Sequence, residues 1–141
     1  RGESGGQQRW TNFNYTEQKT LISVWCMFRS PLMFGGNCIQ NDDFTLSLLT
    51  NEKVIEINQC STNNQEIFRN SNWRVWTANH KDKEMAYFAF INVSEEDLLL
   101  DQNLVDLSLY HTKEDLWKNE IISDLSKVMV ERHGVLLISC Q

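Results

Sequence analysis

The sequence predicts two successive parts, an α/β segment over residues 1–60 and an antiparallel β-sheet domain over residues 61–141. In the first part a helical pattern, a short apolar run and a second helical pattern follow one another, which is α/β order. In the second part short β-rich runs alternate with polar turns, as in antiparallel sheets. The polar stretch CSTNNQ joins the two parts, and we place the boundary near residues 58–65.

The first predicted helix covers residues 14–29 and follows a polar, glycine-rich loop over residues 1–13. Asn14 can cap this helix, and Glu17 stands three residues later, in the position of a capping-box partner. The helix should end before Pro31, because proline disfavours helical geometry in the residue that precedes it. One buried face is predicted by four apolar residues at helical spacing, Leu21, Val24, Trp25 and Phe28.

A buried strand is predicted next, from Pro31 to Phe34, since apolar side chains occupy both alternating faces. Gly35-Gly36 ends the strand, and a second helical pattern follows over residues 41–58, with a break near Thr50. A strand that is apolar on both faces needs hydrogen-bonded neighbours. The chain supplies no parallel neighbour, so we expect the strand to pair outside the chain or to belong to a larger α/β protein.

Five β-rich runs define the predicted strands of the second part. They are WRVWTA (73–78), MAYFAFINV (85–93), DLLLD (97–101), VMVE (128–131) and GVLLIS (134–139). Polar turns separate them, which predicts antiparallel pairing.

Length and charge limit the function. A chain of 141 residues suits one modest domain and is too short for two complete ones. Its net charge is −6 and it has no basic stripe, which argues against a nucleic-acid partner. No apolar run approaches the roughly 20 residues that cross a bilayer. The chain opens on Arg1 rather than on methionine or a signal peptide, so we expect the start to be cut from a longer protein.

No pattern of cysteine or histidine predicts a metal centre. The cysteines have no CxxC pair and no Cys/His spacing for zinc, so we expect isolated buried thiols, with the disulfide state left open. They are Cys26, Cys38, Cys60 and Cys140, and the histidines are His80, His111 and His133. Two segments match the N-glycosylation acceptor pattern, Asn14-Tyr15-Thr16 and Asn92-Val93-Ser94, but the pattern is short and does not establish a secretory compartment.

The acidic clusters have simple structural interpretations. Asp42-Asp43 suits a helix N-terminus, where carboxylates accept backbone hydrogens. Glu95-Glu96-Asp97 is typical of a solvated turn, and Glu52 and Glu56 lie one helical turn apart, as on an exposed face. Four tryptophans are expected to serve packing rather than sugar stacking, namely Trp25, Trp73, Trp76 and Trp117.

Four segments resemble the C-terminal part of glycoside hydrolase family 27, the family of α-galactosidases (melibiases) and α-N-acetylgalactosaminidases. They are EQKTLISVWCMFRSPLMFGGN (17–37), DDFTLSLLTNEKVIEINQ (42–59), DLW (115–117) and RHGVLLIS (132–139). Their order is that of the family, and the resemblance covers nearly the whole chain, most strongly over residues 17–59.

This resemblance implies the C-terminal end of a (β/α)₈ barrel followed by an antiparallel β-sandwich. Residues 14–29 would be the seventh barrel helix, residues 31–34 the eighth strand, residues 41–58 the last helical segment and residues 61–141 the sandwich. Residues 1–13 would form a loop on the face where barrel active sites are built. The resemblance therefore makes Arg9 and Trp10 candidates for the rim of the substrate site, together with Asn37, which follows the predicted eighth strand.

The resemblance also implies retaining hydrolysis of terminal α-linked galactose or a related sugar, with no cofactor. In this family the catalytic pair are aspartates on the fourth and sixth strands, and a further sugar-binding aspartate lies on the seventh. None of these positions is in the chain, so we assign no catalytic residue and expect the isolated chain to be inactive without the missing N-terminal barrel segment.

An alternative is a non-catalytic β-sandwich module that binds carbohydrate or has a structural role. The compartment stays open. The resemblance is compatible with a secreted, periplasmic or lysosome-like location.

Overall fold

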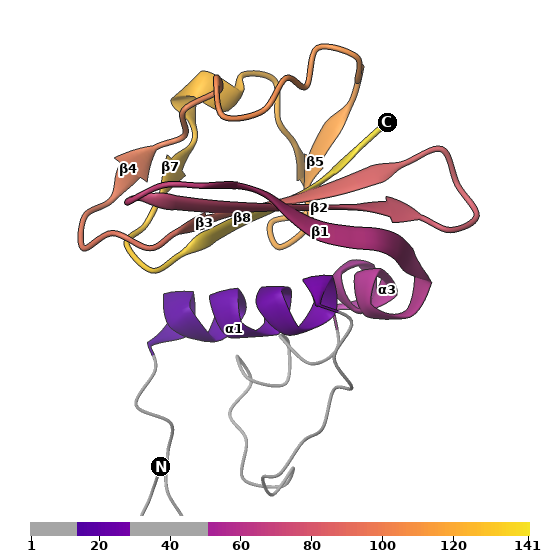
Figure 1. Cartoon of the computed structure of the whole chain (residues 1–141), viewed down its shortest axis with the longest axis horizontal. Helices are drawn as coiled ribbons and strands as arrows, with labels where there is room; N and C mark the ends of the chain where they lie inside the picture. Colours follow the sequence, from indigo (N-terminus) through magenta and orange to yellow (C-terminus); the bar gives the residue numbers. More distant parts are fainter. Residues whose placement is uncertain (1–13, 29–50) are drawn as a thin grey trace, which may run out of the picture.

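Figure 1 shows the computed structural model of the chain, which describes residues 14–28 and 51–141. Two helices come first, α1 (Tyr15–Met27) and α3 (Glu52–Cys60). The remaining elements are β1 (Ser61–Arg69), β2 (Trp73–His80), β3 (Ala86–Asn92), β4 (Leu98–Leu99), β5 (Lys113–Asp115), β6 (Glu120–Ile121), the 3-10 turn η2 (Leu125–Lys127), β7 (Met129–Val130) and β8 (Val135–Cys140).

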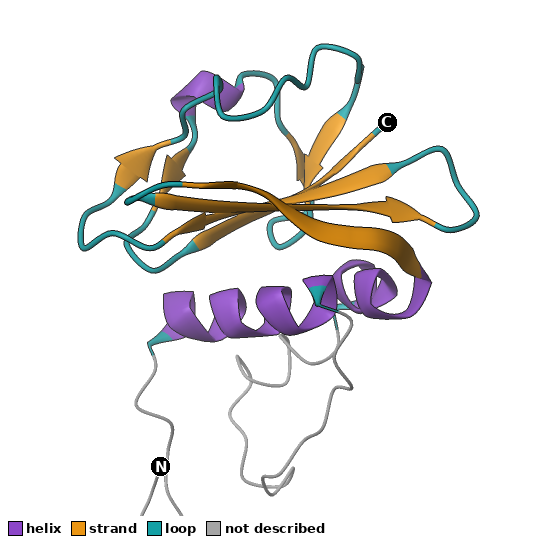
Figure 2. Cartoon of the chain, viewed as in Figure 1, coloured by secondary structure: helices purple, strands orange, loops and turns teal. Residues whose placement is uncertain are grey.

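The described strands form two sheets, and every pairing is antiparallel. The larger sheet has six strands in the order β1-β2-β3-β8-β5-β6, and β4 pairs with β7 in a sheet of two strands. Both helices lie on one side of the larger sheet, while the smaller sheet and η2 lie on the other (Figure 2). The predicted antiparallel second part is thus confirmed.

The predicted start of α1 is also confirmed. Asn14 Oδ1 accepts a hydrogen bond from the backbone N–H of Glu17 at 2.8 Å, and Glu17 Oε1 accepts one from the N–H of Asn14 at 3.2 Å. These reciprocal bonds satisfy two backbone donors that a helix N-terminus otherwise leaves without partners. The helix ends with Phe28 as its C-cap, before Pro31, as predicted.

The predicted buried face of α1 is wrong. The buried residues are Ile22, Ser23, Cys26 and Met27, whereas Phe28 is 48% exposed and Leu21, Val24 and Trp25 are half-buried. Apolar residues occupy two neighbouring stripes of this helix, and both stripes have helical spacing. Periodicity therefore cannot select between them, and contact with the sheet does.

Apolar clusters fill both faces of the larger sheet. On the helix side the cluster contains Ile22, Cys26, Met27, Val54, Ile57, Ala78, Tyr87, Ala89, Leu116 and Leu137. On the other side it contains Trp73, Val75, Ala86, Phe88, Phe90, Leu100, Leu107, Val130, Leu136, Ile138 and Cys140. Successive residues of a strand point to opposite faces, which explains why β3 is apolar almost without interruption. Tyr87 and Ala89 face the helices, and Phe88 and Phe90 face the loops.

The stretch CSTNNQ joins helix to strand without a separate loop, because α3 runs to Cys60 and β1 begins at Ser61. β1 is an edge strand whose side chains are mostly exposed, and its register with β2 is irregular near Asn63, which has a φ of 57°. A search for apolar runs does not detect a polar edge strand, so the sequence patterns did not predict β1. Sequence patterns also missed β5 and β6, which have only three and two residues.

The second helical pattern is confirmed in part. Asn51 caps α3, its Oδ1 accepting from the N–H of Val54 at 3.1 Å, which agrees with the predicted break near Thr50. The predicted strand at 31–34 and the helical residues 41–50 lie outside the described residues, so the barrel end stays a prediction. No described helix has the length and apolarity needed to cross a membrane.

Candidate functional site

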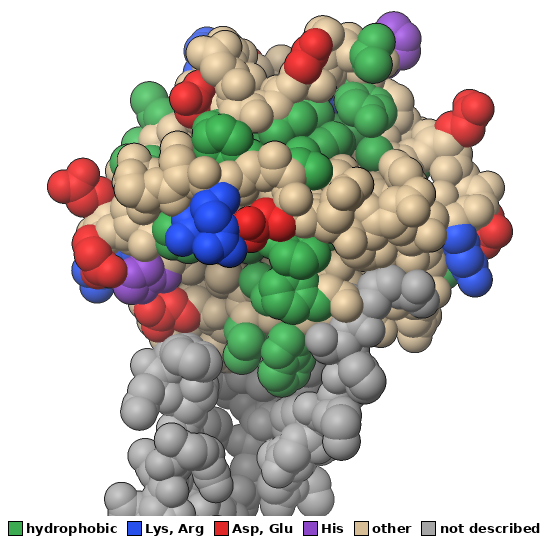
Figure 3. All heavy atoms as spheres, viewed as in Figure 1, with side chains coloured by type: hydrophobic (Ala, Val, Ile, Leu, Met, Phe, Trp, Pro, Cys, Tyr) green, Lys and Arg blue, Asp and Glu red, His purple; other side chains and the backbone are tan. Residues whose placement is uncertain are grey.

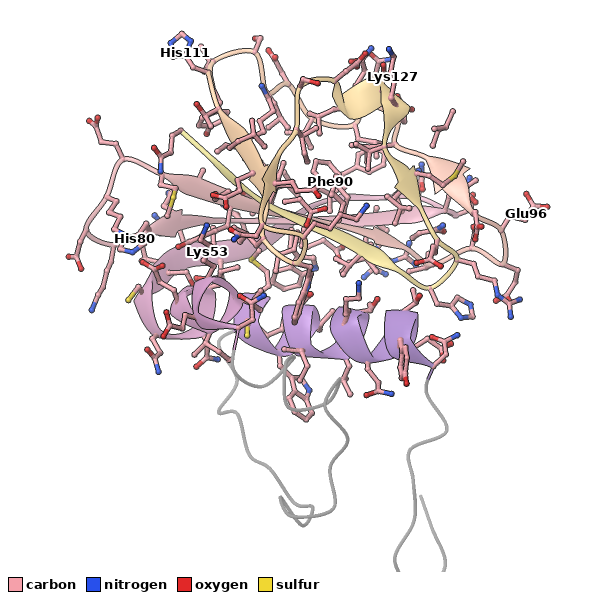
Figure 4. The ribbon with its side chains drawn as sticks, turned by 180° about the vertical axis from the view of Figure 1, so that it is seen from behind. Lys53, His80, Phe90, Glu96, His111 and Lys127 are labelled. Atoms are coloured by element: carbon pink, nitrogen blue, oxygen red, sulfur yellow. The ribbon has the colours of Figure 1, made fainter. Side chains whose placement is uncertain are left out.

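The structure brings Glu56, Cys60 and His80 together, a cluster that the sequence patterns did not predict. Their potential ligand atoms all lie within 4.8 Å of one another. Glu56 and Cys60 are one turn apart on α3, and His80 is delivered by the pairing of Ser61 with His80 in the β1–β2 ladder. The i, i+4 spacing of Glu56 and Cys60 was the sequence feature that could have indicated that these two side chains lie on one face of a helix. The prediction that Glu56 lies on a simple exposed face is therefore wrong, because its carboxylate contacts His80, which is labelled in Figure 4.

Hydrogen bonds around His80 do not fit a metal centre. Its Nδ1 accepts from the backbone N–H groups of Asp82 at 3.0 Å and Lys83 at 3.1 Å, so the ring proton is on Nε2. That nitrogen donates to Glu56 Oε2 at 2.8 Å, and Lys83 Nζ donates to the same oxygen at 3.1 Å. A metal ion bound to Nε2 would require the ring proton to be on Nδ1. That proton would then point at the two backbone N–H donors of Asp82 and Lys83. The cluster instead ties the β2–β3 turn to α3.

Electrostatics agree with a structural role for this cluster. Partial burial opposes ionisation of Glu56, but the hydrogen bonds from His80 and Lys83 lower the pKa of its carboxyl from the ordinary value of 4.5. Nearby, burial raises the pKa of the Tyr87 hydroxyl, with contributions from Glu56 and Cys60. Among the described residues, this hydroxyl is the single buried side-chain N or O atom without a hydrogen-bond partner. Tyr87 therefore stays neutral and offers no base.

Two of the cysteines match the expected buried thiols. Cys26 and Cys140 are fully buried, and burial raises the pKa of each thiol to about 12. Such thiols are poor nucleophiles because the thiolate is the reactive form. Cys60 is half-buried and free, and Cys38 lies outside the described residues.

A shallow groove runs between α1 and the strands β5 and β8. Its volume is about 90 Å³, below the roughly 300–1,000 Å³ typical of ligand pockets. Trp117 at its edge donates from Nε1 to Ser23 Oγ at 2.8 Å, and Asp115 Oδ1 accepts from the N–H groups of Trp117 and Lys118 at 3.0 and 3.1 Å. Glu131 accepts from Thr16 Oγ1 at 3.1 Å. These groups hold turns and α1 in place rather than facing a substrate.

The four tryptophans of the described residues pack, as predicted. Trp73 is buried in the cluster on the loop side, and Trp25, Trp76 and Trp117 pack against the cluster on the helix side. Trp76 also contacts Phe28, with ring centroids 4.3 Å apart.

Asn92, in one of the two glycosylation patterns, is completely buried. Its Nδ2 donates to the carbonyl oxygens of Glu96, Val130 and Glu131 at 2.8, 3.0 and 3.2 Å, and its Oδ1 accepts from the N–H of Ser94 at 2.9 Å. This amide fastens the end of β3 to β7 and is inaccessible to modification in the folded chain. Asn14, in the other pattern, is exposed.

The predicted turn at Glu95-Glu96-Asp97 and the turn at His133-Gly134 are brought together beside α1. Glu95 and Glu17 both bind the His133 ring, and Asp97 Oδ1 accepts from the N–H of Arg132 at 2.9 Å. Charged side chains gather at this end of the molecule, at the left of Figure 3. The substrate-rim candidates Arg9, Trp10 and Asn37 lie outside the described residues.

No family model matches the chain. Among curated proteins it is 27% identical over 131 residues to α-galactosidase D of Emericella nidulans, covering 86% of this chain and 20% of that protein. It is 24% identical over 143 residues to α-galactosidase mel1 of Schizosaccharomyces pombe, covering 86% of this chain and 31% of that protein. The chain thus spans between a fifth and a third of these relatives.

Solved structures give a closer match. A family 27 β-L-arabinopyranosidase from Geobacillus stearothermophilus superposes with a TM-score of 0.82 at 31% identity, over 99% of this chain and 33% of that one. A protein assigned as an α-N-acetylgalactosaminidase from Bacillus halodurans gives 0.83 at 31% identity, over 96% and 33%. The α-galactosidase of Saccharomyces cerevisiae gives 0.69 at 17% identity, over 93% and 44%, a likeness in fold alone. In sequence and in fold, the chain is a relative of the family 27 glycoside hydrolases and is consistent with their C-terminal part.

Proposed function

We propose that the chain is the C-terminal portion of a retaining glycoside hydrolase that releases terminal α-linked galactose, or a related sugar, from oligosaccharides or glycoconjugates. The observation that carries this proposal is the match at 31% identity and a TM-score of 0.82 to a family 27 enzyme over 99% of the chain. The curated relatives are α-galactosidases, which supports galactose as the sugar.

The catalytic carboxylates, in this proposal, come from outside the chain. Retaining hydrolysis needs two carboxyl groups about 5 Å apart across the glycosidic bond. The buried or partly buried carboxylates of the described residues serve other purposes. Glu17 closes a capping box, Glu56 binds His80 and Lys83, and Asp115 holds a turn. Glu66 pairs with Arg69, and Glu114 pairs with Lys53. The 141 residues alone are therefore expected to be inactive.

Residues 1–60 would complete the barrel in this proposal, and residues 61–141 would form the β-sandwich. α1 and α3 contact each other on one side of the larger sheet, which is compatible with this division because the helices of such a barrel lie on its outside (Figure 1). Arg9, Trp10 and Asn37 keep their proposed place at the rim of the sugar site.

Sugar preference is the finer part of the proposal. The named relatives include α-galactosidases, an α-N-acetylgalactosaminidase and a β-L-arabinopyranosidase. The β-L-arabinopyranosyl ring is an α-D-galactopyranosyl ring without the C6 hydroxymethyl group, so these substrates differ only in the groups at C2 and C6. A pocket that discriminates among them does so by contacts at those two carbons.

Hydrolysis of 4-nitrophenyl glycosides tests the proposal. The substrates are α-galactoside, α-N-acetylgalactosaminide and β-L-arabinopyranoside, and the proteins are the 141-residue chain and a longer product of the same gene that extends upstream of Arg1. The longer protein should hydrolyse one substrate with retention of anomeric configuration, and the chain alone should show no turnover. Turnover by the chain alone, or an upstream sequence without two strand-end aspartates, would overturn the proposal.

A non-catalytic carbohydrate-binding module is the second candidate, favoured by one observation. An open depression of about 350 Å³ lies between the loop at residues 102–108 and residues 122–125, and polar side chains including Gln102, Asn103 and Ser123 line it. Saturable binding of galactose by the 141-residue chain without turnover, weakened by Asn103→Ala, would support this candidate. A calorimetric titration that shows only the heat of dilution of galactose would exclude galactose binding by this chain.

A further inference from the structure

The turn between β7 and β8, residues 131–134, is pressed against α1. A Cβ atom added to Gly134 would come within 2.8 Å of the Glu131 carbonyl oxygen and 3.0 Å of Thr16 Cγ2. On the same side, Thr20 Oγ1 donates to the His133 carbonyl oxygen at 2.7 Å. His133 has a φ of 58°, in the left-handed region. The turn thus fixes the His133 ring at the place where α1 meets the sheet layer.

Each nitrogen of the His133 ring faces a carboxylate. Nδ1 lies 2.9 Å from Glu17 Oε2, in the first turn of α1, and Nε2 lies 2.8 Å from Glu95 Oε2, in the β3–β4 connection. A neutral imidazole has one N–H donor and one lone pair, whereas the imidazolium has two donors. While both carboxylates are ionised, both hydrogen bonds can therefore form only when the ring is protonated.

We propose that His133 is a pH-sensitive clamp that, as an imidazolium, ties the first turn of α1 to the β3–β4 connection and releases one of the two carboxylates when it loses its proton. The clamp rests on observed contacts and stands whether or not the proposed function does. In a barrel-bearing enzyme it would join the helical layer to the sheet domain.

Other charged groups near the ring modulate the clamp without reversing it. From the turn itself, Arg132 Nη1 lies 3.8 Å from Glu95 Oε1, the oxygen that His133 does not use, and Glu131 is held by Thr16 of α1. From the β3–β4 connection, Asp97 binds the backbone of Arg132 rather than the ring. Glu17 and Glu95 are thus the two carboxylates that act directly on His133.

The pH window follows from opposite shifts of the two partners. Hydrogen bonds to Glu17 and Glu95 raise the pKa of His133 above 6.5, so its stabilising contribution is complete below 6.5 and is lost as the pH rises through the raised value. The hydrogen bond from His133 lowers the pKa of Glu17 below 4.5, so that contribution is complete above 4.5 and is lost as the pH falls through the lowered value. The clamp is therefore fully formed between about pH 4.5 and 6.5.

Nuclear magnetic resonance of the 141-residue chain tests the clamp. The titration midpoint of the His133 Cε1–H signal should lie above 6.5 and should fall in both Glu17→Gln and Glu95→Gln. Glutamine at position 17 keeps the capping box, so this variant removes the charge and leaves the helix start intact. Between pH 6 and 8.5, the protection of the amides in the first turns of α1, corrected for intrinsic exchange, should fall by roughly two- to tenfold, as expected for exposed ion pairs.

Two histidine variants complete the test. His133→Asn tolerates the left-handed backbone and should remove the pH dependence of α1 protection. His111→Asn is the control, because His111 is exposed and lies on the far side of the molecule from α1 (Figure 4), and it should leave that dependence unchanged. A His133 midpoint at or below 6.5, or the same pH dependence in His133→Asn as in the parent chain, would overturn the proposal.

Discussion

The two faces of the larger sheet are covered in different ways. On one face, α1 and α3 pack against a cluster in which the small residues Ala78 and Ala89 lie between larger ones such as Tyr87. On the other, bulky side chains such as Phe88 and Phe90 are covered by loops and by the small β4–β7 sheet. A helix needs small residues beneath it to approach closely, whereas irregular segments can fold around large rings. We infer from this difference that the helix-covered face adapts less well than the loop-covered face to a change in the size of a buried side chain.

The largest effect is expected from Phe90→Ala, on the loop-covered face. Phe90 is 2% exposed and lies on the side of the sheet away from α1 (Figure 4), so truncation leaves a cavity in a packed cluster. We expect a loss of about 3–5 kcal/mol in the free energy of unfolding, measured by urea denaturation. Ile121→Ala is the control, because Ile121 is 65% exposed and should change stability by less than about 0.5 kcal/mol. A loss for Phe90→Ala as small as the control's would mean that the loops collapse into the cavity.

Ala89→Leu and Ala86→Leu compare the two faces directly, since both residues are buried on β3 but point to opposite sides. Ala89→Leu pushes against the helices and should cost about 1–3 kcal/mol. Ala86→Leu faces loops that can shift, so its loss should be smaller in the same denaturation measurement. An equal or larger loss for Ala86→Leu would refute the claim that the helix face is the less adaptable one.

Ser23→Ala tests the polar link between α1 and the end of β5. It removes the acceptor of the Trp117 indole N–H and leaves that donor unsatisfied in a partly buried site, at a cost of about 1–3 kcal/mol. Trp117→Phe and the double variant complete a mutant cycle in thermal unfolding. A coupling energy near zero would show that the hydrogen bond does not contribute to docking of α1.

The smallest effect is expected from Glu56→Gln, at the end of α3. The lowered pKa of Glu56 means that its contribution is present above pH 4.5 and is lost as the pH falls through the lowered value. Glu56→Gln should therefore flatten the acid limb of a plot of melting temperature against pH. Glu52→Gln, an exposed change on the same helix, is the control and should keep that limb. Identical acid limbs for Glu56→Gln and the parent chain would contradict the assigned role.

Much of the fold was predictable where local chemistry decides it. The capping box at Asn14, the break before α3 and the strands β2, β3 and β8 rest on neighbouring residues or on long apolar runs. β1 was missed because its side chains are mostly exposed and include no long run of apolar residues. The Glu56 and His80 pair was missed because its members are 24 residues apart and meet only through the β1–β2 ladder.

The sequence alone determined the likeness to family 27, the antiparallel character of the second part and the limits of α1, since these depend on residue order and local propensity. The tertiary structure decided which stripe of α1 is buried, because two apolar stripes compete for the sheet. It also decided that Asn92 is a buried hydrogen-bonding hub and that His133 lies between two carboxylates. Asn92 depends on backbone carbonyls and His133 on carboxylates that come from distant segments, and no local pattern encodes such contacts.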